Sequence, residues 1–344
     1  MGGNALKSHG VTRVDPATYV RIRDLVICRL LDSVAVRAQA PLALADKADY
    51  GDVDILVELK CGVVLRDWIV AEFRPRAIVH NGNIWSFNVE NTQVDIITTD
   101  NGGWEMYFNY LSWGDLSNIL GRAARSLDLK FGIDGLWLLE RDPTTHAVIA
   151  TYCISKSPRD IYAFMGYDFN RWECGFTSTD EIREFLFSSP RISRNCLNTE
   201  SENTKHRRRE KNSRTNYIAW CAWFNSHLDE FPEHSESGMP QSFDAKVTYI
   251  EQFFPECRLH FNVDTARRER QAIVEAREKF SGTQIKKLFP DLTNSEFGAF
   301  MARWNSQWPS KLDQAEYILD THPQRLEYQA RQLHQGLAPQ ATAI

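Results

Sequence analysis

The sequence predicts an α+β protein with a mixed sheet and helices in its first half and a mainly helical second half. Short aliphatic runs bounded by Gly and Asn recur up to about residue 155, a pattern typical of strands and hairpins. Beyond that point, apolar residues recur at spacings of three and four, which indicates helices. We therefore expect an α/β domain over 1–155, a helical domain over 156–336 and a disordered tail over 337–344.

The composition is that of a folded protein with a large core. The chain has 344 residues, of which 43% are hydrophobic and 12% aromatic, and this length favours two domains. The net charge of −5 gives no bulk signal for nucleic-acid binding, although a local patch could still bind one. Seven cysteines without a CxxC pair argue against a zinc ribbon or a disulfide framework, and indicate a reducing compartment such as the cytoplasm.

The sequence also indicates no membrane partner. No apolar run approaches the length of a bilayer span, and the first residues lack the apolar segment of a signal peptide. The oligomeric state has no signature in the sequence.

Capping signals and apolar spacing place the first elements. Asp15 before Pro16 predicts a helix start, and apolar spacing extends that helix to about Asp32. A strand and a loop are expected over 34–44, and a helix over 61–73.

Turn signals divide the strands that follow. Asn81-Gly82 predicts a two-residue hairpin that returns through a strand over 84–89, and a further buried strand is expected over 93–98. We then expect a helix over 116–127, a turn over 130–135, and a hairpin about Asp142-Pro143 between strands at 136–139 and 148–155.

Beyond about residue 155, the sequence predicts a series of helices. A capping box at Ser178–Glu181 begins one of them. The others are expected to include 217–223, 243–254, 265–280, 293–305, 312–320 and 323–335.

Two acidic residues open a core strand in the stretch Tyr50 to Val57. Because side chains of a strand alternate between faces, Asp52 and Asp54 share one face. A divalent metal that also binds phosphate oxygens needs such carboxylate ligands. The alternative interpretation is a strand with a polar start, since Asp is common in the turn before a strand.

A third acid favours the metal interpretation. Asp95 lies inside the aliphatic strand 93–98, where a carboxylate is costly unless it is paired or metal-bound. Asp52, Asp54 and Asp95 together predict a centre for two Mg²⁺ or Mn²⁺ ions. Such a centre can bind a nucleoside triphosphate (NTP), activate an acceptor hydroxyl and stabilise the leaving pyrophosphate.

These motifs resemble those of the DNA polymerase β-type nucleotidyltransferase superfamily, which includes poly(A) polymerases, CCA-adding enzymes, oligoadenylate synthases and small-molecule nucleotidyltransferases. Gly2-Gly3, Asp52-Val53-Asp54 and Asp95 match its glycine turn, aspartate pair and third acid in order. The stretches MGGNALK, YGDVDILV, QVDII and SWGDLSNILGR are similar to a branch associated with phages and viruses. The resemblance covers roughly residues 1–135. It implies a polymerase β-like palm in a phage- or virus-encoded protein that acts in the host cytosol.

The resemblance implies roles for the matched residues. Asp52 and Asp54 would bind both metals, and Asp95 would complete the catalytic metal site and help deprotonate the acceptor hydroxyl. Gly2 and Gly3 would hold the triphosphate through backbone N–H groups, with Asn4 in place of the usual Ser. The family separates its glycine turn from the first Asp by a short segment, whereas 48 residues (4–51) intervene here. Either a helix and a strand are inserted, or Gly2-Gly3 is not the phosphate-binding turn.

A segment after the third acid often binds ribose and triphosphate in this superfamily. The residues in this chain that could do so are Ser112, Asn118, Arg122 and Lys130. The alternative for each is a surface polar residue or a helix cap.

The acceptor is indicated by two features of the helical half. The basic run over 206–211 contains Arg207, Arg208, Arg209 and Lys211, and the aromatics Tyr217, Trp220 and Trp223 follow it. The run is either a solvated linker or part of a single-stranded nucleic-acid site, and the aromatic spacing favours a helix core face. KFSGTQI followed by FGAF is similar to the tail of bacterial CCA-adding enzymes, which implies an RNA 3′ end, such as that of tRNA, as the acceptor.

Three other functions stay open at this point. The same core could transfer a nucleotide to a protein or a small molecule. The chain could be a binding or structural relative without turnover, although clustered acids are then kept at a desolvation cost. A two-metal nuclease also uses clustered acids, but the Gly-Gly element and the lack of a further Asp/Glu/His set argue against it. The nucleotide and any template dependence are not indicated.

Overall fold

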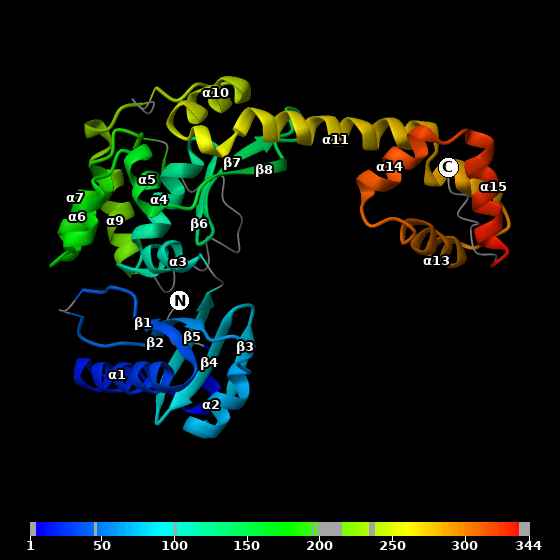
Figure 1. Ribbon diagram of the computed structural model, residues 1–344. Helices are drawn as coiled ribbons and strands as arrows, with labels where there is room; N and C mark the ends of the chain where they lie inside the picture. The colour runs from blue at the N-terminus through cyan, green and yellow to red at the C-terminus, as the bar shows by residue number, and fades with distance from the viewer. Residues whose placement is uncertain are drawn as a thin grey trace. The chain divides into compact units, whose positions relative to one another are not determined.

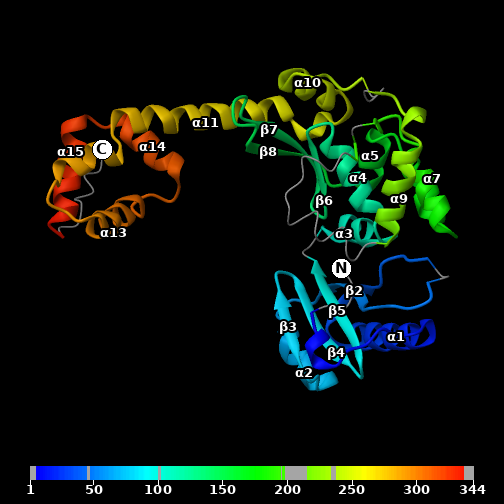
Figure 2. The same ribbon diagram turned by 180° about the vertical axis from the view of Figure 1, so that it is seen from behind.

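The computed structural model describes residues 5–44, 47–99, 102–194, 196–197, 215–233 and 238–336. The chain divides into two compact units, 1–257 and 258–344. The first unit is α+β and the second is helical, as Figures 1 and 2 show from opposite sides. Among the described residues, no helix combines the length and the apolar character needed to cross a membrane.

A five-stranded mixed sheet forms the first part of unit 1. Its strands, in spatial order, are β1 (Ala35–Gln39), β2 (Val53–Leu59), β5 (Thr92–Thr99), β4 (Ile84–Val89) and β3 (Ile78–Asn81). The central pair, β2 and β5, is parallel, and the other neighbours are antiparallel. The mixed sheet of the predicted α+β class is therefore present.

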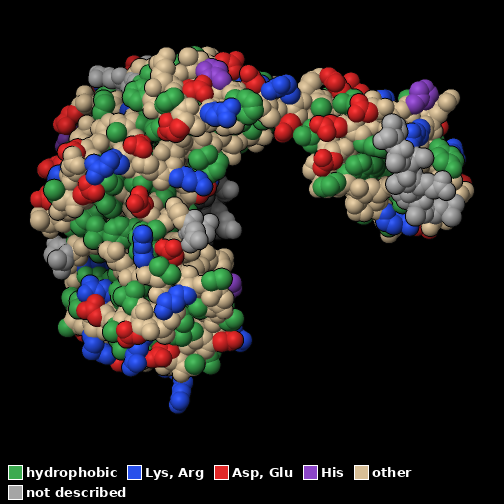
Figure 3. All heavy atoms as spheres, in the orientation of Figure 1, with side chains coloured by type: hydrophobic (Ala, Val, Ile, Leu, Met, Phe, Trp, Pro, Cys, Tyr) green, Lys and Arg blue, Asp and Glu red, His purple; other side chains and the backbone are tan. Residues whose placement is uncertain are grey.

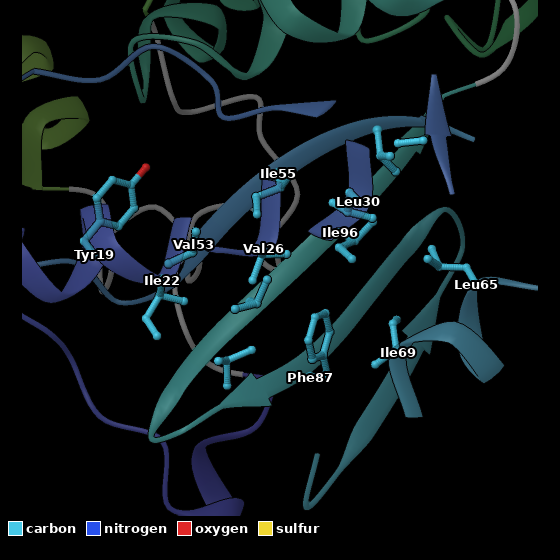
Figure 4. Packing of buried hydrophobic residues seen from close by; sticks show 14 of the residues in the cluster. Tyr19, Ile22, Val26, Leu30, Val53, Ile55, Leu65, Ile69, Phe87 and Ile96 are labelled. Carbon is cyan, nitrogen blue, oxygen red and sulfur yellow. The ribbon is translucent and has the colours of Figure 1, made fainter. Parts of the chain in front are cut away.

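Helices α1 (Pro16–Ser33) and α2 (Leu65–Phe73) share one hydrophobic core with this sheet. Asp15 caps α1 as expected, since its Oδ1 accepts a hydrogen bond from Thr18 N at 2.9 Å. Figure 4 shows the buried face of α1 against side chains of the sheet. The members of that core include Tyr19, Ile22, Val26, Leu30, Val53, Ile55, Val57, Phe87, Val94 and Ile96. Because strand side chains alternate, the intervening residues of β2 and β5 lie on the other face of the sheet.

Two local expectations in this part need correction. Asn81 pairs with Ile84, so the hairpin loop is Gly82-Asn83, one residue later than predicted. Gly82 has φ 62°, a conformation that favours glycine. Helix α2 begins at Leu65 and not at residue 61, because Gly62 is left-handed at φ 79° and Val64 is extended.

The rest of unit 1 contains a three-stranded antiparallel sheet and helices. The strands, in order, are β6 (Leu129–Gly132), β7 (Gly135–Arg141) and β8 (Val148–Ser155). The predicted β7–β8 hairpin is confirmed, whereas the turn expected over 130–135 is wrong except at Ile133-Asp134. The cause is the inward-facing pair Leu129 and Phe131, which makes the segment before the turn a strand.

Seven α-helices of unit 1 are described outside the five-stranded sheet and its two helices. They are α3 (Trp104–Leu111), α4 (Leu116–Arg125), α5 (Pro158–Phe164), α6 (Phe169–Cys174), α7 (Thr179–Phe187), α9 (Thr215–Ser226) and α10 (Phe243–Phe253). Short 3₁₀ turns lie at Lys7–His9, Leu228–Glu230 and Pro255–Cys257. The composition change near residue 155 falls inside this unit, because the later helices pack on α4 and β6–β8. Lys246 of α10, for example, pairs with Asp128 at 2.6 Å.

Unit 2 is a helical bundle around its own core. Its helices are α11 (Leu259–Lys279), α12 (Gly282–Leu288), α13 (Asn294–Asn305), α14 (Lys311–Asp320) and α15 (Pro323–His334). Capping boxes begin α12 at Ser281 and α13 at Thr293. The predicted helices are present, although α11 starts earlier than residue 265, and α12 was not predicted as a separate helix. The expected tail over 337–344 lies outside the described residues.

The surface shows no single-sign field on the face drawn in Figure 3, where Lys and Arg side chains are interspersed with Asp and Glu. This mixture agrees with the modest net charge of −5.

Candidate metal centre

The three predicted acids meet on the face of the five-stranded sheet opposite to α1 and α2. Asp54 is the second residue of β2, Asp95 lies within β5, and Asp52 immediately precedes β2. Asp54 and Asp95 are directly opposite each other in the parallel β2–β5 ladder. One carboxylate oxygen from each of the three side chains lies within 4.8 Å of the others, so the group could hold a metal ion.

The protonation of this cluster is strongly perturbed. Burial raises the pKa of Asp54 to about 8, and the neighbouring charges of Asp52 and Asp95 act in the same direction. Burial also raises the pKa of Asp95 to about 6, with Asp52 adding to the effect and hydrogen bonds from Ser86 and Gln93 opposing it. Without a cation, the cluster therefore retains a proton near neutral pH, chiefly on Asp54. A divalent ion reverses this by stabilising the ionised carboxylates.

Asp95 is held from its own strand and from the neighbouring one. Gln93 Nε2 donates to both carboxylate oxygens of Asp95, at 2.9 and 3.1 Å. Ser86 of β4 is the residue opposite Asp95 in the antiparallel ladder, and its hydroxyl donates to the carboxylate. Both partners are buried. The carboxylate therefore has a defined orientation, as metal ligands held by an outer shell of hydrogen bonds usually have.

Gln93 also ties the beginning of the described chain to the cluster. Its Oε1 accepts a hydrogen bond from the backbone N–H of Leu6 at 3.1 Å, and the Leu6 side chain is fully buried. Leu6 and Asp95 are therefore linked through a single amide. The sequence carried a signal for this residue, because Gln93 and Asp95 share a strand face at a spacing of two, but no role was predicted for it.

The loop before Asp52 is pinned by a second set of contacts that the sequence did not indicate. Arg13 forms a two-pronged pair with Asp49, at 2.9 and 2.7 Å. Val14 and Tyr50 exchange two backbone hydrogen bonds of 2.9 Å. Tyr50 stacks on Tyr19 with ring centroids 3.8 Å apart. These contacts fix the chain two residues before Asp52.

The charges of the acidic cluster also affect Tyr19 of α1, which stacks on Tyr50. Burial raises the pKa of Tyr19 to about 12, and the charges of Asp54 and Asp52 contribute in the same direction. A cavity of about 600 Å³ lies between α1 and residues 38–44, and Tyr19 and Tyr50 line it. The cavity is large enough for a small ligand, but its lining does not include Asp52, Asp54 or Asp95.

The four residues predicted to bind ribose and triphosphate have contacts elsewhere in unit 1. Ser112 Oγ donates to Phe108 O at 2.7 Å and accepts from Leu42 N at 3.0 Å. Asn118 Nδ2 donates to the Asp115 side chain at 3.0 Å.

The two cationic members of that set differ in exposure. Arg122 is buried, and its guanidinium donates to the Tyr217 hydroxyl. Lys130 is exposed and pairs with Asp134 at 2.9 Å. These contacts join the four side chains to α3, α4, α9, Leu42 and the β6–β7 turn, and none of them is to β2 or β5.

The remaining predicted site residues lie outside the described part of the chain. These are Gly2, Gly3, Asn4, Arg207, Arg208, Arg209 and Lys211. The aromatics after the basic run are described: Tyr217 and Trp220 are buried in α9, and Trp223 stacks on His227 with centroids 4.3 Å apart. Tyr217 and Trp220 are therefore core residues, as the helical spacing favoured.

No protein-family model matches this sequence, and no curated protein matches it. The function of the chain is therefore inferred from the geometry of the three acids and of the sheet that holds them.

Proposed function

We propose that this protein is a metal-dependent nucleotidyltransferase, which moves a nucleoside monophosphate from an NTP to an acceptor hydroxyl and releases pyrophosphate. The observation that supports this proposal is the placement of Asp52, Asp54 and Asp95 on two neighbouring parallel strands, with carboxylate oxygens within 4.8 Å of one another. A mixed sheet that carries an aspartate pair and a third acid on one face is what the resemblance to polymerase β-type enzymes leads us to expect.

The donor set suits Mg²⁺ or Mn²⁺. Both are hard cations that prefer oxygen ligands, and Cys and His are absent from this three-residue cluster. Asp52 and Asp54 would bind both ions, and Asp95 would bind one. When bound, two such ions polarise the α-phosphate, lower the pKa of the acceptor hydroxyl and stabilise the leaving pyrophosphate.

The residues of the chain would perform the remaining tasks. Asp95, oriented by Gln93 and Ser86, would accept the proton of the acceptor hydroxyl. Gly2, Gly3 and Asn4 would hold the triphosphate, and the link from Leu6 through Gln93 to Asp95 is compatible with that role. Among Ser112, Asn118, Arg122 and Lys130, only Lys130 has an exposed side chain with which to reach a phosphate.

The acceptor in this proposal is an RNA 3′ end, such as that of a tRNA. Arg207, Arg208, Arg209 and Lys211 would contact its phosphates. An acceptor on a protein or a small molecule would use the same three acids, so the acceptor has to be identified by experiment.

The test is a transfer assay with each of the four labelled NTPs, Mg²⁺ or Mn²⁺, and either tRNA or a generic RNA primer. Extension should occur with the wild type, be lost in Asp54→Asn and Asp95→Asn, and persist in Asp67→Asn, a matched change of an exposed acid on α2. Wild-type activity in either cluster variant would refute the proposal. RNA shortening would indicate a nuclease instead. Label on a protein or a small molecule would show that this molecule, and not RNA, is the acceptor.

A further inference from the structure

The second unit contains a cavity that is separate in the chain from the acidic cluster. It has a volume of about 430 Å³ and lies among α11, α12, α13 and α14. This volume is within the range of small-molecule sites, roughly 300–1,000 Å³. All of its lining residues belong to the described part of unit 2.

Three aromatic side chains, Phe280, Trp304 and Trp308, form part of the lining of this cavity. Phe280 and Trp304 are buried, and their ring centroids are 5.9 Å apart. Trp308 is half-buried and meets Trp304 edge-on at 5.2 Å. Indole faces of this kind bind planar ligands by stacking.

The charge of the lining has one sign. Among the described residues that line the cavity, Arg277 of α11 and Lys311 of α14 are cationic, and none is Asp or Glu. Both cationic side chains are exposed, so they can reach a ligand at the mouth. The lining therefore favours an anion.

The side-chain amides of Asn305 and Gln314, which both line the cavity, are hydrogen-bonded to each other. Gln314 Nε2 donates to Asn305 Oδ1 at 3.0 Å. This bond leaves the Asn305 amide nitrogen and the Gln314 carbonyl oxygen to face other groups. A donor beside an acceptor matches the edge of a nucleobase, which presents the same pair of groups.

The frame of the cavity is pre-formed. Ser281 and Gln284 form a capping box at the start of α12, and Lys279 donates to the carbonyl of Leu319 beyond the cavity. Gly282 lines the cavity, and a Cβ added there would make an ordinary van der Waals contact of 3.7 Å with Met301 Cε. A larger side chain there would enter the space that a ligand needs.

We propose that this cavity binds a nucleoside 5′-phosphate, either free or as one residue of an RNA strand. The base would stack on Trp308 and bond to the amides of Asn305 and Gln314. The phosphate would lie between Arg277 and Lys311. The proposal concerns unit 2 alone, and it holds whether or not the acidic cluster catalyses nucleotidyl transfer.

Isothermal titration of the full chain with AMP, in EDTA to exclude metal-dependent binding at the acids, tests it directly. We expect one saturable site, with adenosine and inorganic phosphate each binding at least about tenfold more weakly, because each lacks half of the contacts. Binding of AMP should weaken at least about tenfold in Trp308→Leu, in Gly282→Leu, and in the double variant Arg277→Glu/Lys311→Glu. Asp54→Asn and the matched surface variant Lys287→Glu should bind as the wild type does.

Two further readouts complete the test. The trinucleotide ApApA identifies the source: tight binding with the same sensitivity to the variants indicates RNA, and binding of AMP alone indicates a free nucleotide. In wild-type protein, AMP should shift the indole N–H resonance that Trp308→Phe removes, which does not depend on the folding of a disruptive variant. The proposal is overturned if neither AMP nor ApApA binds at millimolar concentration, or if binding survives Gly282→Leu and the double charge reversal.

Discussion

Replacing Asp95 with Asn should stabilise the metal-free protein while removing its response to metal. Burial raises the pKa of Asp95 to about 6 from an ordinary value of 3.8. At pH 7 this gap corresponds to about 3 kcal/mol of stability lost by ionising the buried carboxyl. Asn cannot ionise, but it gives up one of the acceptor oxygens that Gln93 and Ser86 use, which costs about 1 kcal/mol. The expected net gain is about 2 kcal/mol.

The sign of the pH dependence follows from the same values. A carboxyl whose pKa is raised by folding binds its proton more tightly in the folded state than in the unfolded chain. The stability that the folded state gains from this tighter proton binding is complete below about pH 4. It is lost as the pH rises through the folded pKa, near 6 for Asp95. Asp54, whose pKa is raised to about 8, extends the loss toward that pH. The advantage of Asp95→Asn should thus appear between pH 4 and 6 and persist above it.

Hydrogen exchange of the β4 and β5 amides in increasing urea measures this effect locally, so the two units need not unfold together. The measurement is made in EDTA at pH 5, 6, 7 and 8, for wild type, Asp95→Asn and the matched exposed variant Asp67→Asn. Excess Mn²⁺ at pH 7 should then stabilise the wild type and Asp67→Asn, and leave Asp95→Asn nearly unchanged. A wild-type pH profile in Asp95→Asn, or an equal gain from Mn²⁺, would refute the assignment of these carboxylates to a metal site.

Three further predictions concern the cluster and its surroundings. Binding of Mn²⁺ at pH 7 should release protons, since the pKa of Asp54 is raised to about 8; titration heats in buffers of different ionisation enthalpy measure the release, and equal heats in all buffers would contradict it. Gln93→Leu should destabilise the sheet by about 2–4 kcal/mol in urea unfolding, because Leu6 N and the Asp95 carboxylate each lose a buried partner; a loss below 0.5 kcal/mol would show that water replaces the amide. Lys246→Met keeps the apolar stem but removes the 2.6 Å pair with Asp128, so a loss of about 1–2 kcal/mol is expected, against no change for the exposed Lys287→Met.

Local signals in the sequence predicted several elements whose ends are marked by side chains. Asp15 with Pro16 begins α1, and Thr293 with Glu296 begins α13, because each pair satisfies backbone N–H groups at a helix start. Several elements without such marks were missed or shortened, and α5, α6 and α12 were missed although Ser157, Asp168 and Ser281 cap them. Helix α3 follows Gly103, which provides no side-chain cap, and α11 follows Arg258, a left-handed residue at φ 48°.

Long-range contacts account for the division into units, which the composition change does not mark. Lys246 and Asp128 are 118 residues apart in the chain, and Arg122 and Tyr217 are 95 apart, yet each pair is in contact within unit 1. Side-chain pairs at such separations leave no periodic signal in a single sequence. The composition near residue 155 records the local change from strands to helices, and the boundary at 257 and 258 depends on which helices pack on β6–β8.

The acidic cluster shows the same limit at the level of single residues. Strand alternation predicts that Asp52 and Asp54 share a face and that Asp95 lies on a face of its own strand, but it does not predict which strands are neighbours. Neighbouring strands lie about 4.8 Å apart, so one intervening strand would separate the carboxylates by about 10 Å, too far for a shared ion. The order β1-β2-β5-β4-β3 places β5 beside β2, with Asp95 in register with Asp54. Strand order therefore makes the metal site possible, and a change that separates β2 from β5 should abolish it while leaving all three acids in the sequence.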